Sequence, residues 1–229
     1  MNSAPAGSAA SPSKRQGEYM SRETTAEKLF RMTEFERPLW AAGFRVCGMD
    51  EAGRGPLAGP VSAACVCLDP DKTVPGVDDS KKLSEKKREE LFERIRENAM
   101  YVKCVFRDAR TIDGINILEA TKRAMEEAAA DAPECVFLID AVTGLALPWR
   151  SESIVKGDAR SHMIAAASII AKVTRDRYML KLDERYPMYG FAKHKGYGTA
   201  EHIAALRKYG PCPEHRRSFL KNILPAEVL

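Results

Sequence analysis

The stretch RVCGMDEAGRGPLAGPVSAACVCL, residues 45–68, contains two apolar runs joined by a segment rich in glycine and proline. The pattern predicts β-strands at Arg45–Met49 and Ser62–Leu68, because short apolar runs bounded by turn-forming residues are typical of buried strands. Two adjacent carboxylates, Asp50 and Glu51, directly follow the first run. The sequence therefore places an acidic pair at the rim of a hydrophobic core, beside a connection with few side chains.

Apolar runs and helical patterns alternate along the rest of the chain. Further strands are predicted at Met100–Phe106, Glu134–Asp140 and Ser153–Asp158. Helices are predicted for a segment capped near Ser84, for Asn116–Asp131, and for a long segment capped by Ser161 and ending before Pro187. The first of these helices carries an apolar stripe formed by Leu91, Phe92, Ile95 and Ala99. This alternation predicts an α/β fold with a central sheet, followed by a helical, loop-rich C-terminal segment.

The composition, 45% hydrophobic and 30% charged residues among 229, is typical of a soluble globular protein. No window approaches the ~18 to 20 apolar residues of a membrane span, so a membrane protein is not expected. Five of the six cysteines lie in apolar runs and none forms a CxxC pair. Reduced thiols in the core of a cytoplasmic protein are therefore expected, rather than a zinc or redox site.

The first 19 residues are rich in Ala, Ser, Pro and Gly and lack an apolar segment. They predict a disordered N-terminal tail rather than a signal peptide. Met20 is an alternative start, because a helix-like pattern follows it. We expect residues 20–43 to form a helical extension and residues 44–229 a single domain that includes the C-terminal segment.

The net charge of +4 arises in residues 191–229, which hold seven Lys and Arg against three Glu. A local excess of this kind is either a solvated face or a footprint for phosphate groups. The charge alone does not decide between the two.

Carboxylates gather at the predicted strand ends. Asp50 ends the first strand, Asp140 ends an almost purely apolar strand, and Asp158 ends a third. Because ligand sites in open α/β sheets lie at the carboxyl ends of strands, these acids and Glu51 are expected to cluster. Oxygen ligands without Cys or His favour a hard cation, Mg²⁺ or Mn²⁺. Any one of these aspartates taken singly is better explained by a helix cap or a lysine partner, whereas the four acids together favour a metal site.

Consecutive residues of a strand point to opposite faces of a sheet. Asp50 and Glu51 can therefore share a site only if the strand stops or bends between them, and Gly53 and Gly55 are where we expect such a break. The glycine-rich segment lacks the Gly-Lys-Ser/Thr ending of a phosphate-binding loop and the GxGxxG spacing of a dinucleotide site. A tight connection would explain its glycines but not Arg54 among them.

The motifs of the chain resemble those of the bacterial ribonuclease HII family. The matching segments follow in order between about Phe44 and Phe219: DEAGRGPLAGPV, DDSKKLSEKKR, INILEAT, LID, KGDARSHMIAAASIIAKVTRD, YGFAKHKGYGT and EHRRSF. The resemblance implies an RNase H-like fold with a central mixed sheet flanked by helices. It also implies hydrolysis of RNA in RNA–DNA hybrids and at single ribonucleotides in duplex DNA.

By motif match, the four acidic places of the family fall to Asp50, Glu51, Asp140 and Asp158. The resemblance implies that Gly53, Arg54 and Gly55 read the ribose 2′-hydroxyl at an RNA–DNA junction and that Tyr197 packs on the adjacent deoxyribose. Backbone groups reach a 2′-hydroxyl only where side chains are absent, which accounts for the glycines. Tyr197 is otherwise explained as a core residue.

Supporting roles are expected for several further residues. Lys81 is a candidate phosphate contact or a solvated lysine, and Ser161 contacts a phosphate or caps its helix. Asp176 is structural, since Lys172 lies one helical turn before it. Candidates for salt-dependent contacts with the DNA backbone are Lys193, Lys195, Arg216 and Arg217.

The expected reaction is two-metal hydrolysis, with the ions ~4 Å apart, giving 5′-phosphate and 3′-hydroxyl ends. One rival is a ribonuclease HIII-like nuclease, which usually has an extra N-terminal domain and glutamate in the fourth acidic place, here Asp158. The other is a non-catalytic nucleic-acid-binding protein on the same fold, although none of the acids is missing. We expect a monomer, and the segment LKNILPAEVL contains no clear sliding-clamp motif.

Overall fold

A five-stranded mixed sheet forms the centre of the protein. The computed structural model describes residue 1 and residues 23–228. The predicted disordered tail, apart from residue 1, and Met20 lie outside the described residues. The strands are β1 (Val46–Ala52), β2 (Val61–Leu68), β3 (Ala99–Arg107), β4 (Val136–Asp140) and β5 (Ser151–Ile154). They lie in the order β3-β2-β1-β4-β5. Strands β1, β2 and β3 pair antiparallel, while β4 pairs parallel with β1 and β5.

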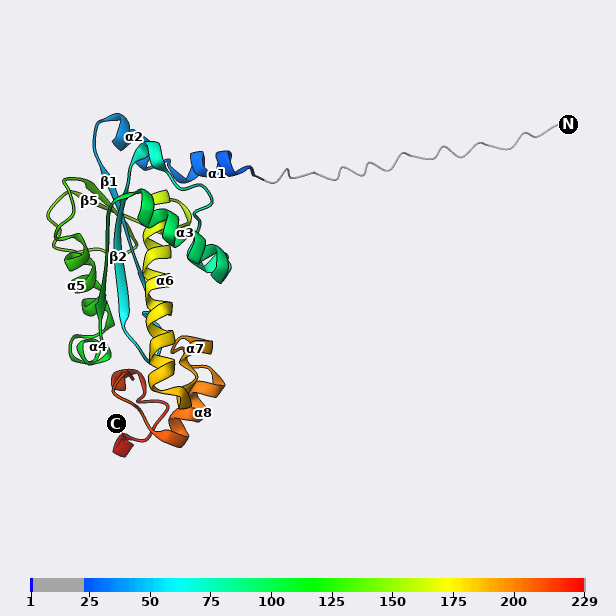
Figure 1. Ribbon diagram of the computed structural model, residues 1–229, viewed down its shortest axis with the longest axis vertical. Coiled ribbons are helices and arrows are strands. Elements are labelled where there is room, and N and C mark those ends of the chain that lie inside the picture. Colours follow the sequence, from blue (N-terminus) through cyan, green and yellow to red (C-terminus); the bar gives the residue numbers. More distant parts are fainter. Residues whose placement is uncertain (2–22, 229) are drawn as a thin grey trace.

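Helices cover both faces of this sheet (Figure 1). Helices α4 (Ala109–Ile115) and α5 (Ile117–Ala129) lie on one face, and α3 (Glu85–Asn98) and α6 (His162–Arg185) on the other. Two helices precede the sheet, α1 (Thr25–Met32) and α2 (Glu36–Ala41), and two follow α6, α7 (Phe191–His194) and α8 (Ala200–Tyr209). The predicted α/β architecture with a central mixed sheet is confirmed.

Alternation along the strands divides the core into two layers. Val46 of β1 and Leu138 of β4 pack in the cluster on the α6 face, whereas Cys47 and Met49 of β1 pack on the α5 face. Strands buried on both faces read as continuous apolar runs, and this is how the sequence reveals them. All six cysteines lie among the described residues and are free, and five of them are buried.

Gly48 sets how closely α6 lies on the sheet. A Cβ atom at this position would lie 2.0 Å from the backbone carbon of Met163. The helix therefore packs directly on β1, two residues before Asp50. Small residues continue this close contact along α6, since Ala165, Ala166 and Ala167 are fully buried.

The predicted helix starts are confirmed. The Ser84 side chain accepts a hydrogen bond from Lys87 N, and Asn116 caps α5 through Leu118 N and Glu119 N. The short helix α4 was not anticipated from the sequence.

Three predicted boundaries are wrong. The first strand does not end at Met49 but runs to Ala52, because β2 continues to pair with it as far as Ala52↔Ser62. The strand before Asp158 ends at Ile154, since Lys156 has a φ of 56° and begins a 3₁₀ turn, η3 (Gly157–Ala159). Ala99 belongs to β3 rather than to the preceding helix.

The C-terminal segment forms a third cluster at the far end of α6 (Figure 1). Phe191, Leu206, Leu220 and Leu224 are buried there around three histidines. Among residues 23–228, no helix combines the length and apolar character needed to cross a membrane.

Candidate active site

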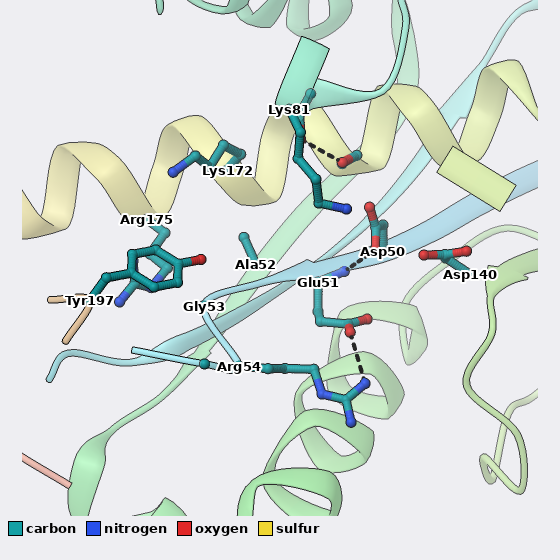
Figure 2. A pocket seen from close by; sticks show the side chains of 13 residues that line it. Asp50, Glu51, Ala52, Gly53, Arg54, Lys81, Asp140, Lys172, Arg175 and Tyr197 are labelled. Atoms are coloured by element: carbon teal, nitrogen blue, oxygen red, sulfur yellow. Dashed lines mark hydrogen bonds and ion pairs between the residues drawn. The ribbon is translucent and has the colours of Figure 1, made fainter. Parts of the chain in front are cut away.

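One pocket lies at the end of the central strands, between the sheet and α6 (Figure 2). It is lined by Asp50, Glu51, Ala52, Gly53, Arg54, Gly55, Ser80, Lys81, Asp140, Ser168, Lys172, Arg175 and Tyr197. Acids, the glycine-rich loop and the tyrosine singled out in the sequence thus come together in one place.

Asp50 and Asp140 lie side by side on the α6 face of the sheet. The last paired position of β1 and β4 is Met49↔Ile139, so the two aspartates follow one residue later on neighbouring strands. Asp158 completes the group, and carboxylate oxygens of the three lie within 4.8 Å of one another. Figure 2 shows Asp140 beside Asp50, with Lys81 above them.

Asp158 reaches this group from the 3₁₀ turn η3 rather than from a strand end. The first residue of the turn, Gly157, donates its N–H to Asp140 Oδ1 at 2.7 Å. The turn therefore fixes both aspartates at once. A Cβ at Gly157 would lie 2.5 Å from the Ile164 side chain, so a larger residue would push the turn away from α6.

Glu51 points to the opposite face of β1 from Asp50, and no break separates the two residues. The predicted bend is therefore wrong. Glu51 still borders the pocket because β4 ends at Asp140, whereas β1 continues to Ala52 without a parallel neighbour. Glu51 Oε1 lies 3.3 Å from Arg54 Nη1, while Oε2 is buried and has no hydrogen-bond partner among the described residues.

Burial and mutual repulsion disfavour the charged forms of the acids. Burial and the charges of Glu51 and Asp140 raise the pKa of Asp50 well above its usual value. Burial likewise raises the pKa of Glu51, against the opposing effect of Arg54, and that of Asp140, against the Gly157 hydrogen bond. Clustered carboxylates with an unpartnered buried oxygen are a donor set suited to a hard divalent cation.

Lys81 forms an ion pair with Asp158. Its Nζ lies 3.1 Å from Asp158 Oδ2, although the lysine side chain is 77% exposed. The 3₁₀ turn η2 (Ser80–Lys82) carries it into the pocket, and a hydrogen bond between the Ser80 and Ser168 hydroxyls anchors this turn to α6. Lys81 is thus held at the acids by its backbone while its ammonium remains accessible.

Two buried arginines support the Gly53–Gly55 loop from behind. Arg216 donates to the carbonyls of Gly53, Arg54 and Gly59 at 2.6 to 3.0 Å. The side chain of Arg175 occupies the space that a Cβ of Gly53 would need, 2.0 Å from its Nε, and Gly53 has a φ of 91°. The predicted contact of Arg216 with the DNA backbone is therefore wrong, because this residue is fully buried and fully engaged.

The hydrogen bonds of Arg216 orient the peptide planes of the loop. In a planar trans peptide the N–H points opposite to the preceding carbonyl. Since the Gly53 and Arg54 carbonyls face Arg216, the N–H groups of Arg54 and Gly55 point to the exposed side of the loop. Neither N–H forms a hydrogen bond within residues 23–228.

Burial lowers the pKa of Arg175 to about 10 and, with the charge of Arg175 nearby, that of Arg216 to about 9. Neither guanidinium forms an ion pair with a carboxylate among the described residues. Both are instead satisfied by backbone carbonyls, which Arg175 takes from Ala58, Pro60 and Lys195. Arg175 therefore ties the glycine-rich connection to the segment that carries Tyr197.

Tyr197 stands at the open end of the pocket, 46% exposed and therefore not a core tyrosine. Its ring lies 3.7 Å from the position of a Cβ at Gly55. Its backbone is held by His202, whose Nδ1 bonds to the Tyr197 carbonyl at 2.9 Å, while His202 Nε2 bonds to His215 Nε2 at 3.0 Å. His202 and His215 thus help to hold Tyr197 in place.

Ser161 is fully buried and caps α6, accepting from Ile164 N at 3.2 Å. The phosphate contact considered for it is wrong, and the helix cap is confirmed.

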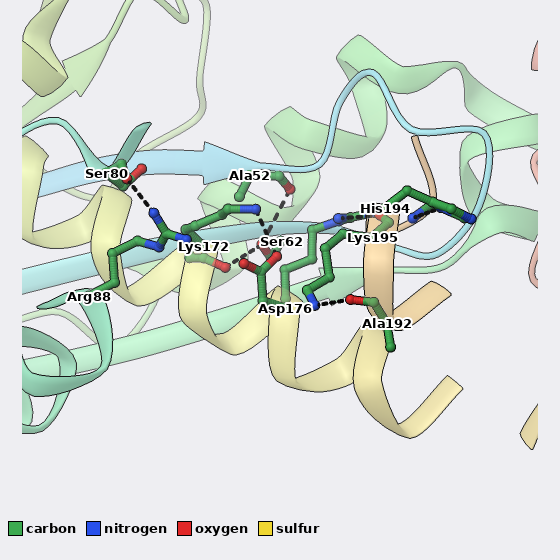
Figure 3. Close-up of polar contacts among 12 residues, drawn as sticks. Ala52, Ser62, Ser80, Arg88, Lys172, Asp176, Ala192, His194 and Lys195 are labelled. Atoms are coloured by element: carbon green, nitrogen blue, oxygen red, sulfur yellow. Dashed lines mark hydrogen bonds and ion pairs between the residues drawn. The ribbon is translucent and has the colours of Figure 1, made fainter. Parts of the chain in front are cut away.

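The remaining basic residues divide between the pocket and the surface. Lys172 pairs with Asp176 at 2.8 Å, as predicted (Figure 3). Lys195 is partly buried and donates to the Ala192 carbonyl, whereas Lys193 is exposed and pairs with Glu201. Arg217 is exposed.

The family model of ribonuclease HII matches residues 47–222. The chain belongs to the ribonuclease HII family. Ribonuclease HII of Ruminiclostridium cellulolyticum is 52% identical over 202 residues, which cover 86% of this chain and 79% of the relative. Ribonuclease HII of Geobacillus thermodenitrificans is 57% identical over 198 residues, 84% of this chain and 74% of the relative.

Solved structures agree with this assignment. The crystal structure of ribonuclease H2 from Pyrococcus horikoshii OT3 has a TM-score of 0.66 at 27% identity, covering 78% of this chain and 96% of that chain. The structure of the PCNA:RNase HII complex from Archaeoglobus fulgidus has a TM-score of 0.65 at 28% identity, covering 76% and 94%. A Bst-RNase HIII structure with Mn²⁺, 19% identical with a TM-score of 0.57 and covering 73% of this chain and 63% of that chain, shows the shared fold alone.

As a ribonuclease HII, the protein is a metal-dependent endonuclease of the RNase H type, a hydrolase acting on RNA-containing nucleic acid. The family match decides against both alternatives considered from the sequence, the ribonuclease HIII-like enzyme and the non-catalytic binding protein.

Sequence reasoning missed the pocket face of α6. Ser168, Lys172 and Arg175 all line the pocket, and their i, i+4, i+7 spacing places them on one stripe of the helix. Polar residues at this spacing within a helix of small apolar residues were the available signal. The packing of Gly48 against Met163 decides which stripe of α6 faces the pocket. This contact is between residues far apart in the sequence, so no local pattern reveals it.

Proposed function

We propose that this ribonuclease HII nicks duplex DNA on the 5′ side of single embedded ribonucleotides. We propose further that it hydrolyses the RNA strand of RNA–DNA hybrids, leaving 5′-phosphate and 3′-hydroxyl ends. One juxtaposition carries the proposal: the carboxylate cluster and the bare Gly53–Gly55 loop line the same pocket. The carboxylates suit phosphodiester hydrolysis, and the loop suits recognition of a sugar from its backbone side.

The acidic residues divide the work by position. Asp50 and Asp140 are the proposed direct ligands, Glu51 serves one ion from the opposite face of β1, and Asp158 ligates an ion or orients water. Two divalent cations held there, Mg²⁺ or Mn²⁺, would supply an activated hydroxide and stabilise the leaving 3′-oxygen. The unpartnered Glu51 Oε2 and the raised pKa values of Asp50 and Asp140 support this assignment.

Recognition of the ribonucleotide falls to the loop. The N–H groups of Arg54 and Gly55 donate to the ribose 2′-hydroxyl in this proposal. A deoxynucleotide at the same position would leave these donors unpaired. Unpaired polar groups reject an analogue that lacks a hydroxyl more strongly than an apolar pocket rejects one that carries an extra hydroxyl. Tyr197 packs on the neighbouring deoxyribose, and its position beside Gly55 supports this role. Arg54 itself turns to Glu51 and so couples the loop to the acids.

Phosphate contacts complete the proposed substrate site. Lys81 is the proposed contact near the scissile phosphate, supported by its exposed ammonium beside Asp158. Lys193, Lys195 and Arg217 are proposed to contact the DNA backbone, with little dependence on sequence.

The enzyme is proposed to act as a monomer in the cytoplasm, which its six free thiols support. The Archaeoglobus relative was solved in complex with PCNA. In this chain Leu220 and Leu224 of the C-terminal segment are buried, so neither side chain is available to a sliding clamp.

The test is cleavage of a DNA duplex that contains one ribonucleotide, with Mg²⁺ or Mn²⁺, beside the Asp50→Asn variant. We expect a single cut on the 5′ side of the ribonucleotide, absent from the variant. Cleavage of long hybrids alone would keep the metal site but remove the role of the loop. Absence of cleavage on both substrates with both metals would overturn the proposed reaction.

A further inference from the structure

The two N-terminal helices precede the segment matched by the family model, residues 47–222, and pack against the catalytic domain. Met32 of α1 is buried in the core cluster on the α6 face, and Glu36 of α2 is fully buried. Figure 1 shows both helices beside the end of the molecule where α6 begins. This N-terminal arm, residues 24–41, therefore contacts the same side of the fold as Asp158.

Glu36 binds the first turn of α6. Its Oε1 accepts from the Ser161 hydroxyl at 2.6 Å and from Met163 N at 3.0 Å. Its Oε2 is buried without a hydrogen-bond partner among the described residues. Burying a carboxylate is unfavourable unless it is hydrogen-bonded, and the partners that offset this cost for Glu36 are both at the start of α6.

A short series of hydrogen bonds leads from Glu36 to the catalytic acids. Ser161 N donates to the Gly157 carbonyl at 2.8 Å, and Gly157 N donates to Asp140 Oδ1 at 2.7 Å. Asp158 lies within this same turn. The carboxylate of Glu36 is thus connected to Asp140, and to the turn that carries Asp158, through Ser161 and Gly157.

The arm also contacts the opposite wall of the pocket. Lys28 of α1 forms an ion pair with Asp78. Asp78 accepts from Asp79 N, and Asp79 in turn accepts from Lys81 N at 2.9 Å. Lys81 in turn contacts the acids, since its Nζ lies 3.1 Å from Asp158 Oδ2.

We propose that the N-terminal arm is a positioning element of the active site, with Glu36 and Lys28 as its positioning residues. Glu36 fixes the turn that presents Asp158 and orients Asp140, and Lys28 fixes the turn that presents Lys81. This inference rests on the proposed role of these acids as metal ligands. Partners of the ligating carboxylates set ligand orientation, and their loss typically weakens metal binding about 10- to 100-fold.

The test is direct binding of Mn²⁺, measured by calorimetry on the full chain without substrate, at a temperature where every variant is folded. Glu36→Ala removes the acceptor of Ser161 and Met163, and we expect about tenfold weaker Mn²⁺ binding. Glu36→Gln keeps an acceptor oxygen of the same size and should restore binding to near the wild-type value. Arg31→Met, which breaks the ion pair between the arm and the preceding Glu23, is the matched control and should bind as the wild type does.

Equal Mn²⁺ affinity in Glu36→Ala and wild type would overturn the inference and leave the metal site intact, even if the variant were less stable. Absence of Mn²⁺ binding by the wild type would overturn the metal site, and this inference with it.

Lys28→Met provides a test should Glu36→Ala fail to fold, because the Lys28 side chain is partly exposed and its replacement leaves the core unchanged. We expect faster amide hydrogen exchange at residues 79–82 in this variant, measured without metal, and no change in Arg31→Met. The same exchange in both variants would contradict the proposed contact of the arm with the Lys81 turn.

Discussion

The acidic cluster and the Gly53–Gly55 loop face each other across one pocket, but the structure holds them in opposite ways. Asp50, Asp140 and Asp158 repel one another and are kept together by the sheet, the η3 turn and burial. The loop, in contrast, has its carbonyls satisfied by Arg216 and its shape fixed against Arg175. The catalytic half thus holds like charges close together, whereas the loop of the recognition half is fixed by hydrogen bonds and packing.

This difference matches what each half must do. A cluster that binds cations must keep several carboxylates close together, and their repulsion lowers the stability of the metal-free protein. The same charges raise the affinity for a cation. A loop built to distinguish a hydroxyl from a hydrogen atom has to hold its donors still, since misplaced donors would accept both sugars. Substitutions in the two halves should therefore change stability in opposite directions.

The largest expected effect is that of Asp50→Asn. Activity should fall by roughly three orders of magnitude or more, because a ligand charge is lost. The metal-free protein should nevertheless become more stable at pH 8, by about 2 to 4 °C in Tm for each kcal/mol of repulsion relieved. Thermal unfolding with EDTA checks this, and added Mn²⁺ should raise the Tm of the wild type more than that of the variant. A lower Tm for metal-free Asp50→Asn would contradict the repulsion assigned to the cluster.

Arg216→Met should lower the stability of the protein, in contrast to Asp50→Asn. It leaves the carbonyls of Gly53, Arg54 and Gly59 without their donor, at a cost of roughly 2 to 4 kcal/mol in the free energy of unfolding. Cleavage at single ribonucleotides should fall more than cleavage of long hybrids, since the loop loses its orientation. Urea unfolding and the two cleavage rates check this, with Arg123→Met, an exposed position on α5, as the control. An equal loss on both substrates would show that Arg216 supports the fold only.

The acidic cluster and the histidines behind Tyr197 should change the stability of the protein in opposite directions as pH falls. Burial lowers the pKa of His202 to about 4 and that of His215 to about 3, below the value near 6.5 of an unfolded chain. The unfolded chain then binds more protons as pH falls from about 6.5 toward 3, so this region loses several kcal/mol of stability over that window.

The raised pKa values of Asp50, Glu51 and Asp140 act with the opposite sign. Their contribution is fully present below the unfolded values near 4 and is lost as pH rises through the folded ones. Urea unfolding of metal-free protein between pH 8 and pH 4 checks both effects. In Asp50→Asn the loss of stability on acidification should be steeper, because part of the compensating gain is gone. An unchanged pH profile would contradict this division.

The smallest effect is expected at the surface. Lys193→Ala should raise the KM for duplex substrate by no more than about threefold and lower its salt dependence by about one unit of slope. Cleavage rates from low to moderate salt check this. A loss that is independent of salt would argue against a backbone contact.

The sequence predicted the acidic half of the pocket better than the Gly53–Gly55 loop and its support. The apolar runs and the caps at Ser84, Asn116 and Ser161 were predictable from local patterns. The identities of the four acids were predictable from the apolar runs and the motifs that contain them. The support of the loop was not. Arg216 looks like any basic residue of the C-terminal end, and only tertiary packing shows that it lies buried beneath Gly53.

Two further features depended on long-range geometry. The sequence suggested a bend between Asp50 and Glu51, whereas the structure lets both border the pocket by ending β4 early. Asp158 was expected at a strand end and instead lies on a 3₁₀ turn, since the left-handed Lys156 ends the extended chain. In both cases the residues were correctly identified, and the backbone path that brings them together was not.

The most direct test of recognition by a fixed loop beside the acidic cluster is the cleavage preference of Gly55→Ala. A Cβ at Gly55 meets only the Tyr197 ring at 3.7 Å, so the fold has room for it, while it covers the exposed side of the loop. Gly114→Ala, where a Cβ meets nothing within 4 Å, is the matched control. We predict a loss of about 10- to 100-fold at single ribonucleotides, corresponding to one or two lost hydrogen bonds, with Mn²⁺ binding unchanged. Wild-type cleavage at single ribonucleotides by Gly55→Ala would contradict the role of the loop as the reader of the 2′-hydroxyl.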